Sequence, residues 1–179
     1  MPNWCHNELT VEGSEEELGR FHDAHARTSD DGDPEFTFQG SAPRPKVLGR
    51  IVSGGCTIDG EKVNTWVERD GKPVRIADRT LAFLAARYGA VNWYDWSVKN
   101  WGVKWDAGEA AFDASPGRRT YSFATAWGPP AEWARTASAA FPGLSLRLDY
   151  DESGMGFAGT LEVAGGATLV DESREYDGE

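Results

Sequence analysis

The sequence is poor in the residues that build thiol and metal sites, with two cysteines and three histidines among 179 residues. Cys5 and Cys56 lie far apart and show no CxxC or Cys/His ligand spacing, so we expect reduced thiols and no disulfide or zinc. His22 and His25 lie three residues apart on a predicted helix, but no third ligand follows at a suitable spacing. We therefore expect surface histidines and neither a bound metal nor a cofactor.

Long apolar runs are also missing. No stretch approaches the ~20 apolar residues that a membrane helix needs. The first ten residues, MPNWCHNELT, lack the basic and then apolar layout of a signal peptide. Hydrophobic residues make up 40% of the chain, which is enough to build a core. These features predict a soluble cytoplasmic protein with no membrane partner.

Basic residues are in the minority, with 18 Lys and Arg against 29 Asp and Glu, and the net charge is −11. This charge disfavours non-specific binding to duplex DNA, because phosphate contacts need a basic surface. Residues 1–35 and 149–179 hold 19 of the 29 acids but only three bases, whereas residues 36–148 are mildly basic. We expect the acidic ends to keep the protein soluble; a DNA-mimicking acidic face is the alternative.

Residue periodicity predicts a mixed order of strands and helices. Ser14 and Glu17 form a capping box that begins a helix running to about Arg27. Other helices are predicted at 78–88 and after Pro129-Pro130, and strands at 7–11, 109–112, 120–126, 144–150 and 154–163. Without an inserted region this order is β-α-β-β-α-β plus one strand, the ferredoxin-like split βαβ arrangement. We predict an α+β fold, with an antiparallel sheet and helices on one face.

The domain organisation follows from this order. We predict one ferredoxin-like domain over residues 1–163, with an insertion at about 28–90 that holds a helix and a hairpin. Glycine pairs and turn dipeptides between residues 51 and 73 favour the hairpin. Residues 164–179 are expected to form an acidic, polar tail that frays.

A tryptophan-rich segment, VNWYDWSVKNWGVKWD, covers residues 91–106 and holds four of the eight tryptophans. Indole is costly to leave in water and needs a partner for its N–H, so such a segment is either core or an aromatic binding surface. Polar residues alternate with the rings, which argues against a uniformly buried strand.

Four islands of sequence together resemble the YubB-like family, small phage- and plasmid-encoded proteins with a C-terminal ferredoxin-like domain. The islands are PNWCHNELTVEG, YDWSVKNWGVKWD, FATAWGPP and YDESGMGFAG. The resemblance implies a ferredoxin-like fold and an origin in a mobile element. The family has no established catalytic residues, so none is transferred to this chain.

The islands also predict a shared structural centre. Glycines let a backbone pass close to large rings, so we expect the GMGFAG segment to lie beside the tryptophans. The residues assigned to this structural motif are Asn3, Trp4, Trp101, Trp105, Trp127, Gly154, Gly156 and Phe157, with the aromatic members meeting in one cluster.

A partner-binding surface is predicted at the outer part of the tryptophan-rich segment. The rings of Trp93 and Trp96 are expected to face the partner. The full set of predicted partner-binding residues is Trp93, Trp96, Lys99, Asn100, Lys104 and Asp106.

Candidate catalytic groups are weak. Cys5 and His6 are neighbours in a predicted strand and point to opposite faces, so His6 is badly placed to activate the thiol. Asp95, Asp106 and Glu109 are explained as well by turns and strand ends as by acid–base or Mg²⁺ chemistry. We assign no catalytic residue and expect a binding protein rather than an enzyme.

Three functions stay open. The first is a non-catalytic interaction protein from a mobile genetic element that binds and modulates a host protein, such as a defence component. The second is a single-stranded nucleic-acid-binding module that stacks bases on the aromatic sheet, with charge from Lys99, Lys104, Arg118 and Arg119. The third is an enzyme that acts on a nucleotide or small molecule.

Overall fold

The structure, a computed structural model, describes residues 3–29 and 31–176. The chain forms two compact units, which are described separately. The first unit joins Met1–Pro43 to Asn100–Glu179, and the second is Arg44–Lys99.

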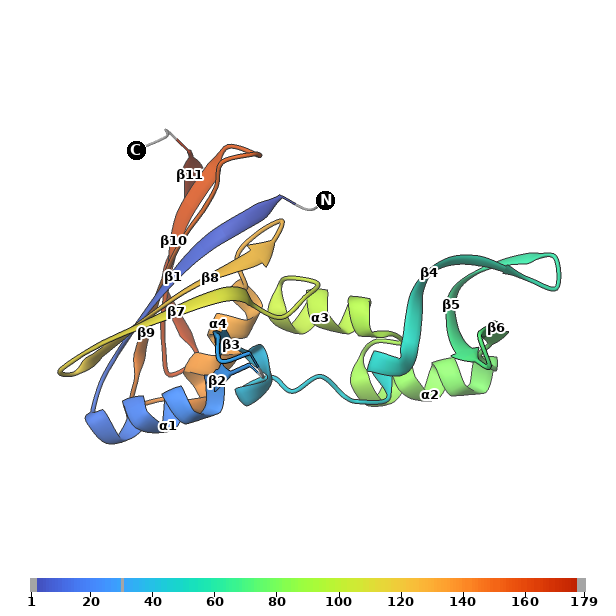
Figure 1. Cartoon of the computed structure of the whole chain (residues 1–179), viewed down its shortest axis with the longest axis horizontal. Coiled ribbons are helices and arrows are strands. Elements are labelled where there is room, and N and C mark those ends of the chain that lie inside the picture. The colour runs from blue at the N-terminus through green and yellow to red at the C-terminus, as the bar shows by residue number, and fades with distance from the viewer. Residues whose placement is uncertain (1–2, 30, 177–179) are drawn as a thin grey trace. The chain divides into compact units, whose positions relative to one another are not determined.

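A six-stranded antiparallel sheet forms the centre of the first unit (Figure 1). Its order is β11-β10-β9-β1-β8-β7. The bounds are β1 (Trp4–Glu12), β7 (Gly108–Ser115), β8 (Arg118–Ala126), β9 (Ser145–Glu152), β10 (Phe157–Ala164) and β11 (Ala167–Glu175). The four strands β9-β1-β8-β7 have the strand order of a ferredoxin-like sheet, so the prediction of an α+β, ferredoxin-like domain is confirmed.

The predicted frayed tail is wrong for most of its length. Residues Ala167–Glu175 form β11, which pairs with β10 over its whole length. Gly165 and Gly166 both have positive φ, 55° and 79°, and turn the chain back in a tight hairpin. The acidic composition of β11 hid this strand, since most of its side chains face solvent and show no apolar alternation.

Two helices, α1 (Glu15–His25) and α4 (Ala131–Ala140), cover one face of this sheet (Figure 1). Alternation along β1 explains which side they cover. Cys5, Leu9 and Val11 are buried beneath the helices, whereas His6 and Glu8 are exposed on the other face. The opposite face of the sheet is left open.

The predicted capping box begins α1, where the Ser14 side chain accepts a hydrogen bond from the Glu17 backbone N–H. The helix ends at His25, two residues earlier than predicted, because Ala26 adopts an extended conformation. A short hairpin of β2 (Ala26–Thr28) and β3 (Pro34–Phe36) follows, and then a 3₁₀ turn, η1 (Phe38–Gly40).

His25 is fully buried, so the prediction of a surface histidine is wrong for this residue. Its Nδ1 lies 2.9 Å from the Phe21 carbonyl oxygen and its Nε2 lies 2.7 Å from the Ser41 hydroxyl. The ring packs among aromatic side chains, including Phe36 and Trp133. Burial lowers the pKa of His25 from 6.5 to about 4.

The second unit contains a three-stranded antiparallel sheet and two helices. Its elements are η2 (Leu48–Arg50), β4 (Ile51–Ile58), β5 (Glu61–Arg69), β6 (Lys72–Arg75), α2 (Asp78–Tyr88) and most of α3 (Trp93–Trp101). The hairpin turns are Asp59-Gly60 and Asp70-Gly71, with positive φ at all four residues, as a two-residue type I′ turn requires. Gly89, with φ 69°, ends α2 as predicted.

The boundary of this unit differs from the predicted insertion. The unit begins at Arg44 rather than near residue 28, because residues 28–43 pack with the ferredoxin-like unit. The tryptophan-rich segment is helical from Trp93 to Trp101 and continues as a loop into β7.

We predict that the folded state loses stability as the pH falls from 6.5 towards 4. The unfolded chain protonates His25 near pH 6.5, while the folded chain resists protonation until about pH 4, so acid favours unfolding. This residue alone lowers the free energy of unfolding by about 2–3 kcal/mol between pH 7 and pH 4.5. Urea unfolding at pH 7 and pH 4.5 gives the free energy of unfolding of the protein and of His25→Gln. The protein should lose more stability than the variant between the two pH values. Equal losses would contradict the role of His25.

Candidate functional site

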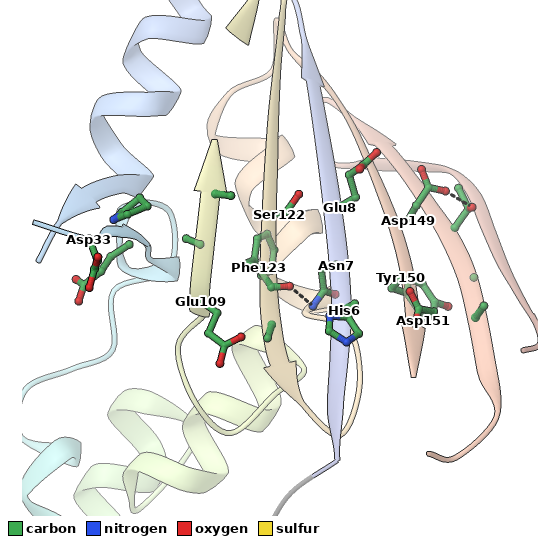
Figure 2. A pocket seen from close by; sticks show the side chains of 18 of the residues that line it. His6, Asn7, Glu8, Asp33, Glu109, Ser122, Phe123, Asp149, Tyr150 and Asp151 are labelled. Atoms are coloured by element: carbon green, nitrogen blue, oxygen red, sulfur yellow. Dashed lines mark hydrogen bonds between the residues drawn. The ribbon is translucent and has the colours of Figure 1, made fainter. Parts of the chain in front are cut away.

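The open face of the six-stranded sheet forms a groove of about 1160 Å³. Figure 2 shows labelled lining residues from neighbouring strands on this part of the sheet. The lining comes from β1, β3, β7, β8, β9, β10 and β11, so the groove crosses the strands. With strands about 4.8 Å apart, six strands span about 24 Å.

Acidic side chains dominate the lining. Seven carboxylates line the groove: Glu8, Asp31, Asp33, Glu35, Glu109, Asp149 and Asp151. Among the described lining residues, Arg174 is the one arginine and His6 the one histidine. Low-dielectric walls around charges of one sign concentrate a negative potential in a cleft.

Two of these carboxylates face each other across the two central strands. Glu8 on β1 is directly opposite Asp149 on β9 in the strand register. Asp149 has its own partners: Arg147 donates to its two oxygens at 2.7 and 2.9 Å, and the Thr160 hydroxyl donates at 2.5 Å. Within the described residues, no ion pair includes Glu8. Like charges directly opposite each other destabilise a sheet. The carboxylate of Glu8 is therefore unfavourable for the stability of the fold.

The floor of the groove is fixed by Asn7, which is buried on the helix side of β1. Its Nδ2 donates to the Cys5 carbonyl at 3.0 Å, the Phe123 carbonyl at 3.3 Å and the Thr125 hydroxyl at 2.8 Å. The bonds to Phe123 and Thr125 join β1 to β8, and Figure 2 shows the one to Phe123. His6 and Glu8, the neighbours of Asn7, consequently have fixed positions on the open face.

Cys5 is not a nucleophile in this fold. Burial, with the nearby charges of Asp151 and Glu152, raises the pKa of the Cys5 thiol to about 12. The thiol is therefore protonated at neutral pH, and only a thiolate reacts readily. His6 lies on the opposite face of the strand, as expected from the alternation.

Glu152 is a buried residue that the sequence analysis missed. Its carboxylate accepts hydrogen bonds from the backbone N–H groups of Gly154, at 2.9 Å, and Met155, at 2.7 Å. It thereby organises the turn before β10, in which Gly156 has φ 74°. The sequence signal was an acid two residues before the GMGFAG segment, whose glycines alone entered the prediction.

The predicted aromatic cluster forms only in part: the ring centroids of Trp4 and Trp105 lie 6.3 Å apart, but Trp101 packs elsewhere. Trp101 is buried in the core, where its Nε1 donates to the Ala42 carbonyl at 2.9 Å and its ring lies 5.6 Å from that of Phe38. Trp4 and Trp127 are 46% and 47% exposed, so they do not belong to the buried centre.

Of the remaining members of the predicted motif, Asn3 lies beside both Trp127 and Gly154. Phe157 packs against Tyr150, with ring centroids 6.2 Å apart. Asn3 accepts a hydrogen bond at its carbonyl from the Trp127 backbone N–H. A Cβ at Gly154 would collide with the Asn3 side chain, which explains the glycine there.

The predicted partner-binding residues divide between the two units: the second unit holds Trp93, Trp96 and Lys99, and the first holds Asn100, Lys104 and Asp106. Trp96 is only 7% exposed, so the prediction that its ring faces a partner is wrong. Trp93 is half-buried, and the Arg44 guanidinium lies 5.9 Å from its ring centroid. The Lys99 ammonium is 3.5 Å from the Gly89 carbonyl oxygen at the end of α2, and Asn100 is half-buried at the end of α3.

Asp106 has a structural role that its partners make plain. Its carboxylate accepts hydrogen bonds from the Thr37 hydroxyl at 2.8 Å and from the Phe38 backbone N–H at 2.7 Å. Both oxygens are therefore engaged within the fold. Lys104, two residues earlier, lies with its Nζ 3.7 Å from the ring centroid of Trp105.

The C-terminal part of the chain matches a known domain. Residues 100–179 match the family model of the ferredoxin-like domain in Api92-like protein. The matched segment contains β7 to β11 and α4, including the Asp149–Asp151 side of the groove. The Api92-like domain is therefore what residues 100–179 are similar to.

A solved structure extends the likeness to the whole chain. It is the crystal structure of protein Api92 from Yersinia pseudotuberculosis, with 12% sequence identity and a TM-score of 0.54, and the match covers 100% of this chain and 99% of that one. At this identity the likeness concerns the fold. No curated protein sequence matches the chain.

Over residues 3–29 and 31–176, no group of three or more His, Cys, Asp or Glu side chains is placed to bind a metal ion. In the same described residues, none of the helices has the length and apolar character to span a bilayer.

We predict that Glu8→Gln stabilises the protein. The change removes one of the two facing charges and raises the free energy of unfolding by about 0.2–1 kcal/mol at low salt. Glu12→Gln is the matched control, since Glu12 lies on the same strand and face but opposite Arg118. Urea unfolding at 20 mM and 1 M salt measures both, and the gain for Glu8→Gln shrinks at high salt. An equal effect of the two substitutions would contradict the repulsion.

Proposed function

We propose that the protein is a non-catalytic interaction protein that binds a positively charged segment of a partner protein in the groove of its open sheet face. The observation that carries the proposal is the pair of Glu8 and Asp149, which face each other among seven groove carboxylates. A cationic side chain of a partner placed between the two carboxylates reduces their repulsion. This gain contributes favourable free energy to binding.

The extent of the groove suits a protein segment. Its volume of about 1160 Å³ lies just above the range of about 300–1,000 Å³ that is typical of small-ligand pockets, and its lining comes from seven strands. Its estimated 24 Å length accommodates about seven residues of extended chain at 3.3–3.4 Å per residue.

The same face argues against the single-stranded nucleic-acid alternative. Base stacking on a ferredoxin-like sheet uses aromatic side chains on the central strands. Here β1 and β8, the central pair of the four ferredoxin-like strands, present His6, Glu8, Ser122 and Ala124 to the groove, and the exposed Trp4 ring of β1 is not among the lining residues. The surrounding carboxylates also repel phosphate.

The biological setting is part of the proposal. The four islands similar to YubB-like proteins support an origin in a mobile genetic element, and with it a host protein as the target. An interaction protein of this kind modulates its target by covering a basic surface, and it needs no catalytic group.

Fluorescence anisotropy with a labelled, lysine-rich nine-residue peptide tests the proposal. We expect binding at 50 mM salt that weakens at 200 mM salt, because surface charges are screened. The double variant Glu8→Gln/Asp151→Asn should bind about ten-fold more weakly, a loss of about 1.4 kcal/mol.

The matched control carries the same change of charge on the covered side of the sheet. Glu16→Gln/Asp23→Asn alters two exposed acids of α1 and should bind within two-fold of the unchanged protein. Equal losses in both double variants would show that net charge alone attracts the peptide, and the groove proposal would fail. Tight binding of a labelled single-stranded oligonucleotide at 50 mM salt would favour the alternative function instead.

A further inference from the structure

Exposed tryptophans gather at the end of the sheet where β1 begins. Trp4 is 46% exposed and Trp105 is 40% exposed, and their ring centroids are 6.3 Å apart. Trp127 lies at the same end, because its backbone N–H bonds the Asn3 carbonyl immediately before β1. In Figure 1 the start of β1 and the arrowhead of β8 mark this end. Large exposed aromatic side chains are the residues that most often anchor protein interfaces.

The tryptophan pair borders the acidic groove. Trp4 precedes His6 by two residues on β1, so both side chains lie on the open face, about 7 Å apart along the strand. His6 lines the groove, and so does Glu109, four residues beyond Trp105. The two rings therefore form an aromatic border beside the carboxylates.

A cation of the protein itself, Lys104, contacts one ring of this aromatic border. The Lys104 ammonium lies 3.7 Å from the centroid of the Trp105 ring, within the range of a cation–π contact. The neighbouring Trp4 ring has no such contact among the described residues, and it is nearly half exposed. The aromatic border thus has both a cation-binding ring and an open one.

Trp127 supports a role for exposed indoles at this end. Its φ is 74°, a left-handed conformation that is strained for a bulky residue and free for glycine. The Trp127 ring is 47% exposed. Burial of this ring therefore does little to offset the backbone strain. Such strain clusters at functional sites.

We propose that the segment bound in the groove is rich in arginine, with one guanidinium stacked on Trp4 and others paired with Glu8 and Asp151. The inference rests on the proposed function and names the chemistry of its partner. Arginine fits both parts of the surface, because its planar guanidinium stacks on indole and also donates in pairs to a carboxylate. Lysine satisfies the carboxylates as a point charge but stacks less well.

Two nine-residue peptides of equal charge, one with arginine and one with lysine alternating with glycine, test the choice of partner. Anisotropy measured at 100 mM salt should show about two- to five-fold tighter binding of the arginine peptide, as expected for an exposed cation–π contact. Trp4→Leu keeps an apolar side chain without the ring. This variant should lose that preference while its affinity for the lysine peptide changes less than two-fold.

Phe83→Leu is the matched control, because Phe83 is an exposed aromatic residue on α2, 62% exposed, outside the ferredoxin-like unit. It should leave the arginine preference intact. Thermal unfolding of each variant shows whether it is folded, and Trp105→Leu repeats the test if Trp4→Leu unfolds.

The outcomes separate this inference from the proposed function. Equal binding of both peptides, with no effect of Trp4→Leu, would overturn the inference and leave the groove proposal standing. Binding of neither peptide would overturn both. A preference for arginine that survives both tryptophan variants would place the selectivity among the carboxylates and contradict the role of the aromatic border.

Discussion

The register of β1 between β8 and β9 is the constraint on which the rest of the first unit depends. A slip of one residue would exchange the two faces of the strand, burying His6 and Glu8 and exposing Cys5 and Leu9. Burial of Leu9 and Val11 under the helices and the bonds of the Asn7 amide to β8 oppose such a slip. The alternation of buried and exposed side chains along β1 therefore produces both the core and the acidic face.

At the centre of the open sheet face, the residue that would favour stability differs from the residue that we propose for binding. An apolar or uncharged residue in place of Glu8 would remove the repulsion with Asp149, and nothing in the core requires the carboxylate. Residues that lower the stability of a fold without a compensating contact are typical of functional positions. The border of Trp4 and Trp105 shows the same tension, because two large rings are left half in water.

Local sequence signals predicted much of the fold. Apolar alternation located the core strands, and the capping box at Ser14 and the glycine at 89 located helix ends, since these depend on neighbouring residues alone. β11 was missed because a mostly exposed edge strand shows no apolar period. His25 was misplaced because its burial depends on Phe36 and Trp133, which approach only in the folded chain.

The candidate site was less predictable than the fold. Acidic ends were visible in the sequence, but Glu8 and Asp149 are 141 positions apart and only strand pairing sets them face to face. The tryptophan-rich segment drew attention to Trp96, which is buried, while the exposed border is formed by Trp105 near the end of that segment and by Trp4 at the start of the chain. The high tryptophan content of the segment therefore indicated the right residue type but only one of the two ring positions.

The central claim is that the open face, and not the helix-covered face, receives a basic segment. Backbone amide shifts in a ¹⁵N-labelled sample, titrated with the arginine–glycine peptide, test it directly. The account predicts the largest shifts at His6, Glu8, Asp149 and Asp151, with small shifts on α1 and α4. Shifts concentrated on the helices, or spread evenly over all exposed acids, would contradict it.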